Sequence, residues 1–375
     1  MKSHLSSAGL FLLSVLIALL VVEICLRVFS PVELRLQGRE IRLPHFREYR
    51  ITAEPGSRLP EMAVHTRNGL GFRGPPPPND FERHLTLIAV GGSTTECFAL
   101  GDGLCWPARL QERLSGTFSD VWVNNAGLAG HTSQGHIELL RQHIVDIRPD
   151  AVLFLVGVND LYFSEFTEAY DRRLNEEEDT AEALRHWAAE NSALVSLAFA
   201  AYKQWRAQQH DLTGQDRDFT ELLTGPTPPE DAQAELARHR DNAYFGYRDR
   251  LEDLVAISRS AGIIPIFATQ PAVYGPATDP RTGIDLGAIR NGVDGFDGRT
   301  SWRLLEAYND VMRDVAHRHE VLLVDLADKM PKDSTFFLDQ VHFTPDGADR
   351  VADILYPGVC ALLAEQFPGH VTGAC

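Results

Sequence analysis

The chain contains, from residue 87 to residue 96, the stretch Leu87-Ile88-Ala89-Val90-Gly91-Gly92-Ser93-Thr94-Thr95-Glu96. Its apolar first half is typical of a short strand that is covered on both faces, as in parallel sheets. The glycines that follow allow a sharp turn into a helix, which a Cβ would obstruct. Ligands of open α/β sheets bind at the carboxyl ends of the strands, where Ser93 would then lie. Taken alone, the stretch fits a nucleophilic serine, a phosphate-binding loop or a plain strand-to-helix connection.

Further apolar runs alternate with helical patterns along the rest of the chain. The strand-like runs are residues 87–90, 121–123, 151–156, 263–268 and 321–324. The helical patterns cover about residues 106–114, 134–147, 247–260, 302–319 and 345–366. Short apolar strands joined by crossover helices predict an α/β fold with a doubly wound parallel sheet of about five strands, covered on both faces.

The domain organisation follows from where this alternation begins and where it is interrupted. We expect an N-terminal membrane segment over residues 1–30, a polar stalk or extended wrap over 31–85 and a catalytic domain over 86–370. The alternation breaks over about residues 161–244, where we expect a helical insertion whose residues 176–210 have an amphipathic pattern. This insertion is either a lid over the site or a helical pair packed on the edge of the domain.

The N-terminal segment is uncharged over the 18 residues from Leu5 to Val22. That length is at the short limit for a membrane-spanning helix and slightly long for the core of a signal peptide. Because no A-x-A cleavage pattern follows, we predict an uncleaved anchor in preference to a cleaved signal. Arginines after the span, among them Arg27 and Arg35, leave its orientation open.

The net charge and the cysteines bear on which partners the protein can bind and on the redox compartment in which it lies. The formal net charge is -17 with a pI of about 5.2, so the surface would repel phosphate backbones and nucleic acid is not an expected partner. The cysteines are Cys25, Cys97, Cys105, Cys360 and Cys375. Cys97 and Cys105 could pair in an oxidising compartment, or the thiols could be isolated and buried. The absence of a C-x-x-C motif argues against a zinc or dithiol redox site.

The far end of the chain carries Asp339-Gln340-Val341-His342. A spacing of three places both side chains on one side of a turn, so that the carboxylate can orient the imidazole. Acyl transfer by Ser93 needs such a pair, a base for the hydroxyl proton and an acid group that fixes the tautomer. Thr344 can cap a helix that starts at Pro345, which would leave His342 in the preceding loop. Alone, the motif fits a surface turn with a solvated histidine better than a catalytic pair.

Candidate oxyanion donors follow the second and third predicted strands. Asn159, in Gly157-Val158-Asn159-Asp160, can offer its side-chain N–H, or it can be an ordinary turn residue that bonds its own backbone. Gly130, in residues 125–133, would let its backbone N–H approach a substrate closely, or it can be an ordinary turn glycine.

Taken together, these blocks resemble the SGNH hydrolases, the wider group around the GDSL esterases and lipases, over about residues 86–366. Ser93, Gly130 and Asn159 match the first three blocks, with Gly127 as a second alignment for the glycine, and residues 339–342 match the last. Gly92 stands where the eponymous motif has aspartate. The stretch 68–74 and the N-terminal span are similar to bacterial membrane-anchored members, which are presumed to act on acylated envelope carbohydrate. The G-x-S-x-G elbow of the larger α/β-hydrolases is not formed.

The resemblance implies a three-layer α/β/α flavodoxin-like domain that needs no metal or organic cofactor. It implies Ser93 as nucleophile, His342 as base oriented by Asp339, and an oxyanion hole of the Ser93 and Gly130 N–H groups and the Asn159 amide. The expected substrate is an O-acyl ester of a small molecule, glycan or lipid, on the extracytoplasmic side of the membrane.

Other readings stay open at the level of the sequence. One is an O-acyltransferase, such as an O-acetyltransferase, that passes the same acyl group to an envelope glycan. A more remote one is a non-catalytic phosphate- or nucleotide-binding module. The oligomeric state is open.

Overall fold

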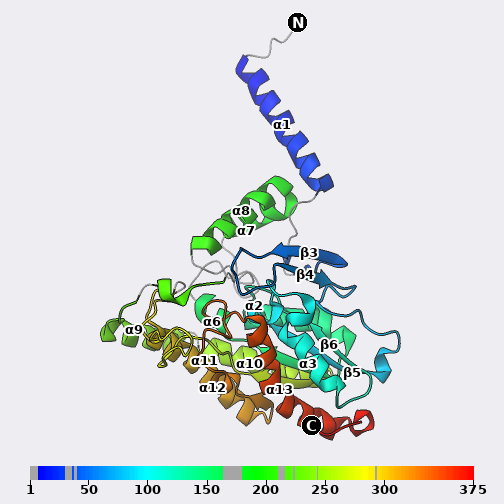
Figure 1. Cartoon of the computed structure of the whole chain (residues 1–375). Helices are drawn as coiled ribbons and strands as arrows, with labels where there is room; N and C mark the ends of the chain where they lie inside the picture. Colours follow the sequence, from blue (N-terminus) through cyan, green and yellow to red (C-terminus); the bar gives the residue numbers. More distant parts are fainter. Residues whose placement is uncertain are drawn as a thin grey trace. The chain divides into compact units, whose positions relative to one another are not determined.

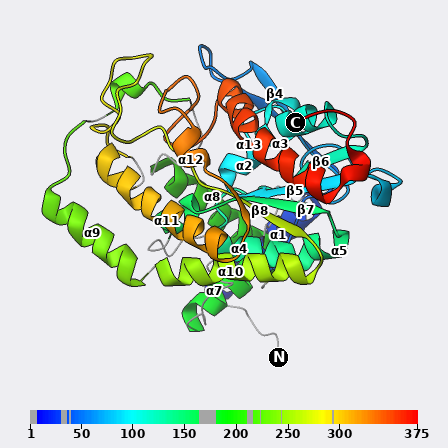
Figure 2. The ribbon, with the colours of Figure 1, turned by 90° about the horizontal axis from the view of Figure 1, so that it is seen from below.

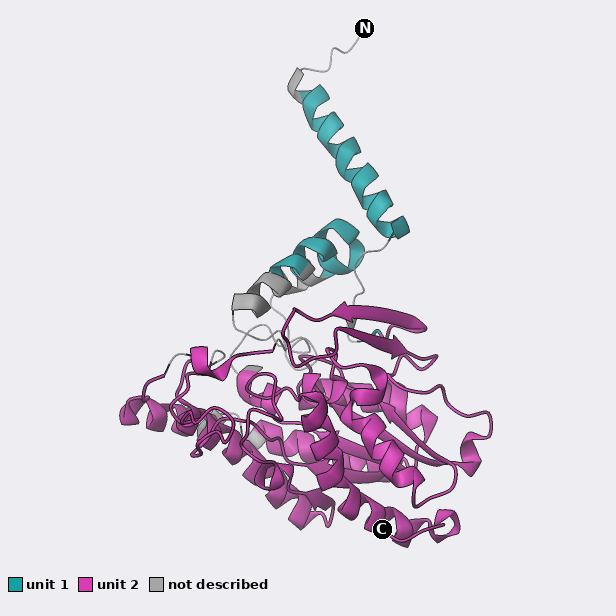
Figure 3. Cartoon of the chain, viewed as in Figure 1, with its two compact units in different colours: residues 1–42, 176–212 teal, residues 43–175, 213–375 magenta. Residues whose placement is uncertain are grey.

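The computed structural model describes residues 7–29, 36–37, 40–163, 180–209, 216–222, 224–242, 244–291 and 294–375. The chain divides into two compact units, which are coloured separately in Figure 3. Unit 1 consists of residues 1–42 and 176–212, and unit 2 of residues 43–175 and 213–375. Each unit is therefore built from segments that are distant in the sequence.

Unit 1 contains the apolar N-terminal helix and a helical pair. Its elements are α1 (Ser7–Phe29), the short strands β1 (Leu36–Gln37) and β2 (Glu40–Ile41), and the helices α7 (Thr180–Asn191) and α8 (Ala193–Gln209). The part of α1 from Gly9 to Phe29 is long and apolar enough to cross a membrane, and none of its most apolar window is buried. Such a helix can be a membrane anchor or a signal sequence.

A parallel sheet forms the centre of unit 2. In the described residues its strands are β5 (Leu85–Gly91), β6 (Val121–Asn125), β7 (Ala151–Leu155), β8 (Ile264–Ala268) and β9 (Leu322–Val324). They lie in the order β6-β5-β7-β8-β9, and every neighbouring pair is parallel. All residues of β5 and β7 are buried, as expected for strands covered on both faces. The predicted α/β class and parallel sheet are confirmed.

Helices cover both faces of this sheet, which gives the three layers visible in Figure 2. One face carries α3 (Trp106–Ser115) and α13 (Pro345–Gln366), which pack against each other. The other carries α4 (Ser133–Leu139), α10 (Tyr244–Ser260) and α11 (Gly298–Arg318). A π turn over Leu140–Ile144 and the short α5 (Val145–Ile147) continue α4.

Further helices and 3₁₀ turns belong to unit 2. The helices are α2 (Ser93–Glu96), α6 (Val158–Phe163), α9 (Pro229–Asn242) and α12 (Leu326–Lys329), with 3₁₀ turns at Phe81–Arg83, Asp102–Leu104, Phe219–Glu221 and Pro368–His370. The helix expected near residues 345–366 has the bounds of α13, whereas α10 and α11 begin three to four residues earlier than the apolar pattern indicated. The start of α11 was misplaced because its first turn, residues 298–301, has no large apolar side chain and so carries no apolar signal. At α11 the carboxylate of Asp297 caps that turn through the Thr300 N–H.

The segment expected to be irregular, residues 31–85, contains an antiparallel hairpin. Its strands are β3 (Arg47–Thr52) and β4 (Met62–Arg67), drawn in blue in Figure 1. In β4 the residues Ala63, His65 and Arg67 are buried and alternate with more exposed ones. The period of two is present, but two of the three buried side chains are polar, so hydrophobicity alone did not reveal a strand.

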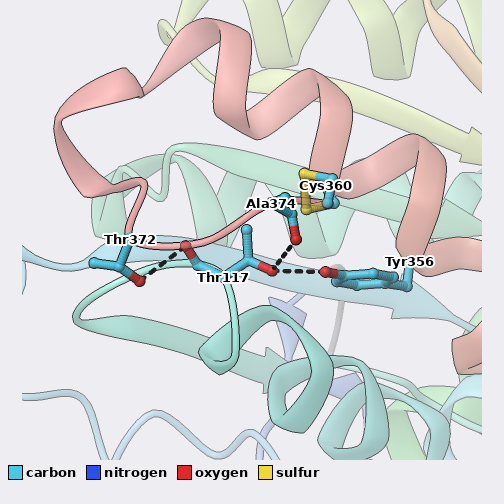
Figure 4. The surroundings of a disulfide bond; sticks show 6 residues. Thr117, Tyr356, Cys360, Thr372 and Ala374 are labelled. Atoms are coloured by element: carbon cyan, nitrogen blue, oxygen red, sulfur yellow. Dashed lines mark hydrogen bonds between the residues drawn. A yellow bond between two sulfur atoms is a disulfide. The ribbon is translucent and has the colours of Figure 1, made fainter.

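The disulfide of this chain joins Cys360 in α13 to Cys375, with a Cα–Cα distance of 5.7 Å. Figure 4 shows the C-terminal residues beside Thr117, whose carbonyl oxygen accepts hydrogen bonds from the Thr372 N–H and hydroxyl. The suggested pairing of Cys97 with Cys105 does not form. Both are free and buried, and each donates its S–H to a nearby backbone carbonyl.

We expect Cys375→Ser to lower the free energy of unfolding by about 3 kcal/mol, because a closed loop of this length limits the unfolded chain by roughly that amount. Thiol titration of the denatured, unreduced wild type should find free Cys25, Cys97 and Cys105, and reduction should release two more thiols. A Cys105→Ser variant is the control for removal of a thiol. Five titratable thiols before reduction would contradict the assignment.

Candidate active site

Ser93 lies at the first position of α2, directly beyond the carboxyl end of the central strand β5. The order β6-β5-β7 reverses the direction of winding between β5 and β7, so this is the switch point at which doubly wound sheets bind ligands. Ser93 is half-buried, whereas the rest of α2 is buried. The sequence thus places the Ser93 hydroxyl at the rim of a buried core.

Asp339 and His342 lie in the loop that precedes α13. Their turn is closed by a hydrogen bond of 2.7 Å from the Leu338 N–H to the His342 carbonyl. Thr344 caps α13, as expected, by accepting the Gly347 N–H at 3.0 Å. Because α13 packs on α3, which follows the Ser93 turn, the loop is brought back to the carboxyl end of β5.

The three side chains form a continuous hydrogen-bonded chain. His342 Nε2 lies 2.8 Å from Ser93 Oγ, and His342 Nδ1 lies 2.7 Å from Asp339 Oδ2. The other oxygen of Asp339 accepts the N–H groups of Val341 and His342, each at 2.9 Å. Since an ionised carboxylate only accepts, Nδ1 carries the proton and Nε2 is free to accept the serine hydroxyl.

Burial and pairing oppose each other in setting the charges of this pair. Burial by itself raises the pKa of Asp339, but the charge of His342 and hydrogen bonds from His342 and Val341 outweigh it, so that this pKa lies below its usual value. Burial likewise lowers the pKa of His342, but the charge and hydrogen bond of Asp339 outweigh it and raise that pKa above its usual value. Asp339 therefore stays ionised and makes the imidazole a stronger base.

The structure brings Asn159 to the same turn. Its side-chain amide donates to the His131 carbonyl at 2.8 Å, and a Cβ on Gly92 would overlap its Nδ2 atom. The glycine before Ser93 thus creates the space that the Asn159 amide fills. Gly130 lies in the loop after β6 with a φ of +80°, a conformation that favours glycine. Gly127 packs against the backbone of Glu96, where no side chain would fit.

Sequence and structure comparisons place this chain among known proteins. Residues 89–350 match the GDSL-like Lipase/Acylhydrolase family. The chain belongs to that family.

Among its relatives, the esterase TesA of Pseudomonas aeruginosa is 35% identical over 75 residues, which are 20% of this chain and 37% of TesA. The chain thus matches well under two thirds of that relative's length. A crystal structure of TesA superposes with a TM-score of 0.41 and 18% identity over 74% of this chain and 99% of that one. The crystal structure of Axe2, an acetylxylan esterase of Geobacillus stearothermophilus, superposes with a TM-score of 0.42 and 15% identity. This match covers 73% of this chain and 93% of Axe2.

In this GDSL-like family member, further hydrogen bonds hold the loops of the site together. The Leu128 N–H donates to the Gly91 carbonyl at 2.9 Å, which joins the loop after β6 to the end of β5. Asp160, the residue after Asn159, accepts the Ser133 N–H at 3.0 Å and is paired with Arg250 at 3.1 Å. The sequence predicted no role for Asp160. Its buried carboxylate joins α6 to the start of α4.

The sequence did not predict a buried cluster of charged side chains near Ser93. Glu96, at the end of α2, pairs with Arg67 of β4 and accepts the Ala129 N–H at 2.8 Å. Arg73 donates to the carbonyls of Glu96 and Cys97 at 2.6 Å each. Glu96 therefore joins the helix of Ser93 to the loop of Gly130, and the two arginines tie both to the N-terminal hairpin segment. The available signal was Arg67, directly before the glycine-rich stretch 68–74, and Arg73 within that stretch.

In the described parts of the chain, no group of three or more His, Cys, Asp or Glu side chains has the arrangement of a metal site. The polar groups at the turn are instead a hydroxyl, an imidazole, a carboxylate and an amide. This set can transfer a proton and present N–H donors to a developing negative charge.

We expect Glu96→Gln to destabilise unit 2 by up to about 3–5 kcal/mol, because it removes the carboxylate that compensates the buried Arg67. The Gly130 loop should also lose its fixed position, so kcat should fall more than KM changes. Thermal unfolding and steady-state kinetics measure both effects. Glu112→Gln is the matched control, since its side chain is 69% exposed in a surface pair and should change stability by less than about 1 kcal/mol. Equal behaviour of the two variants would contradict the positioning role of Glu96.

Proposed function

We propose that this protein is a serine esterase that cleaves an O-acyl ester through an acyl-enzyme. The observation that carries the proposal is the chain of 2.8 and 2.7 Å contacts from Ser93 through His342 to Asp339. A nucleophile, its base and the group that orients the base lie within hydrogen-bond reach, as covalent catalysis by a hydroxyl requires. Membership of the lipase/acylhydrolase family supports the same chemistry.

In the proposed first step, Ser93 Oγ attacks the ester carbonyl carbon and its proton passes to His342 Nε2. The imidazolium that forms is stabilised by Asp339, whose carboxylate stays ionised. When the tetrahedral intermediate collapses, His342 returns the proton to the oxygen of the leaving alcohol. Water then attacks the acyl-serine with the same base, which releases the acid and regenerates the Ser93 hydroxyl.

The negative oxygen of the intermediate needs donors that are already in place. We assign them to the N–H groups of Ser93 and Gly130 and to the amide of Asn159. Support comes from the loops that carry them, because the His131 carbonyl orients Asn159 and Glu96 holds Ala129, the neighbour of Gly130. Donors fixed in this way need little reorganisation when charge develops.

The proposed substrate is an O-acyl ester on cell-envelope carbohydrate or lipid, with the catalytic domain, residues 86–370, on the extracytoplasmic side of the membrane. The relative TesA supports ester cleavage, since it is an esterase. The apolar helix α1 supports attachment to a membrane. The disulfide between Cys360 and Cys375 supports an oxidising compartment.

Substitution of the nucleophile gives the first test. Ser93→Ala should abolish both hydrolysis of p-nitrophenyl acetate and labelling by a fluorophosphonate, because both need the hydroxyl. Asn159→Ala should keep the labelling but lower kcat by on the order of 10²–10³, the usual loss of one oxyanion donor. Ser115→Ala, at an exposed serine of α3, is the control. Wild-type turnover by Ser93→Ala would refute the assignment.

The pH dependence tests the role of Asp339. His342 must be neutral to accept a proton, so kcat/KM should fall with decreasing pH through a pKa above the usual histidine value. Asp339→Asn removes the interactions that raise this pKa, so the acidic limb should move to lower pH. It also loses control of the tautomer, and kcat should drop by up to about 10⁴-fold. An acidic limb unchanged in Asp339→Asn would show that another group controls it.

A further inference from the structure

In the first half of α8, residues 193–202, the described side chains that are exposed are not the polar ones that a helix normally presents to water. From residue 193 to residue 202 the helix reads Ala-Leu-Val-Ser-Leu-Ala-Phe-Ala-Ala-Tyr, with no charge. The exposed positions in this half are Leu197, Ala198, Ala201 and Tyr202, which form one stripe because they are spaced by four along the helix. An apolar stripe of this kind is expected to be covered.

The neighbouring helix α7, which packs against α8, adds to this apolar surface. Leu184 and Trp187 are three residues apart, so they lie on one face of α7. They are 63% and 61% exposed, although leucine and tryptophan are usually well buried. Both helices of the pair therefore present large apolar side chains outward.

Glu23 of α1 joins this pair to the apolar N-terminal helix. Its carboxylate accepts the N–H groups of Ala193 and Leu194 at 2.8 and 3.0 Å and the Ser192 hydroxyl at 2.8 Å. Arg27, one turn further along α1, pairs with the same carboxylate at 2.7 Å. The first acidic residue of α1 thus caps the N-terminus of α8, a position that favours a negative charge.

This cap fixes where α8 begins along α1. The uncharged part of α1, residues 7–22, is about 24 Å long at 1.5 Å per residue, which is most of the hydrocarbon thickness of about 30 Å. Glu23 follows at once, so it would lie where the hydrocarbon core meets the headgroups. The start of α8 is bound to this point. Its uncharged half, residues 193–202, is followed by the cations Lys203 and Arg206 and by Trp205, a composition typical of a membrane interface.

We propose that α7 and α8 form an interfacial helix pair that lies in the lipid headgroup region beside the α1 span. The apolar face made by Leu184, Trp187, Leu197 and Tyr202 dips into the acyl boundary, and the occupant of that face is the bilayer itself. Such helices bury their apolar faces by about 5–10 Å. The hydrogen bonds to Glu23 require that α1 is retained, so α1 acts as an anchor that also sets the depth of the pair. The inference does not depend on the esterase proposal.

Spin labelling of the full-length protein in phosphatidylcholine–phosphatidylglycerol vesicles tests this directly. Leu184→Cys and Trp187→Cys, each combined with Cys25→Ser, place a nitroxide on α7. Glu112→Cys in the same background is the control, because that side chain is 69% exposed on α3. Wild-type protein labelled at the exposed Cys25 reports on the anchor. Power saturation then compares collisions with oxygen, which partitions into lipid, and with a water-soluble nickel chelate.

The expected result is an oxygen-to-chelate accessibility ratio several-fold higher at positions 184 and 187 than at 112, with an intermediate ratio for the Cys25 label, which lies two residues beyond Glu23 at the membrane interface. Equal ratios at 184, 187 and 112, with the Cys25 label still at the interface, would show that the pair lies in water although the anchor is real. Low accessibility to both reagents at 184 and 187 would mean that protein covers them, and would equally overturn the proposal. A water-exposed Cys25 would remove the anchor and the inference together. Esterase activity of each variant is measured separately and bears only on the proposed function.

Discussion

The site depends on a hydrogen bond between two residues that are 249 positions apart, Ser93 and His342. Neither partner can reach the other through local structure. The serine is fixed by the end of β5, and the histidine by the loop before α13. The parallel sheet and the packing of α13 on α3 supply the meeting point. The buried carboxylate of Asp339 then holds the imidazole in the orientation and tautomer in which Nε2 can accept the Ser93 hydroxyl.

Much of this arrangement could be predicted from the sequence because its signals are local. Apolar runs marked all the strands of the sheet, and Thr344 with Pro345 marked the start of α13. The hairpin β3–β4, by contrast, alternates buried His65 and Arg67 with exposed residues, so its pattern is invisible to hydrophobicity. The bond between Cys360 and Cys375 depends on where the C-terminal residues return to α13, and cysteine spacing says nothing about such a return. Local pattern thus located the elements, whereas the long-range pairings needed coordinates.

The buried charges show why the segment before the sheet belongs to the catalytic unit. A buried arginine is costly unless it is paired and hydrogen-bonded. Arg67 meets that condition through Glu96, and Arg73 does so through backbone carbonyls and Asp102. The same bonds that neutralise the arginines restrain the helix of Ser93 and the loop of Gly130. The same hydrogen bonds therefore stabilise the hairpin segment and hold Ser93 and Gly130 in position.

Residue 92 is a glycine at a position where a neighbouring side chain leaves no room for a Cβ. In the eponymous motif of the family this position is aspartate, yet here any side chain at residue 92 would collide with the amide of Asn159. That amide is held by the carbonyl of His131, in the loop that also carries Gly130. The departure from the motif is thus coupled to the placement of Asn159 rather than to Ser93, whose hydroxyl keeps its contact with His342. The motif can lack its acidic residue while Ser93, His342 and Asp339 stay in contact, because the position of the serine depends on the end of β5 and on α2.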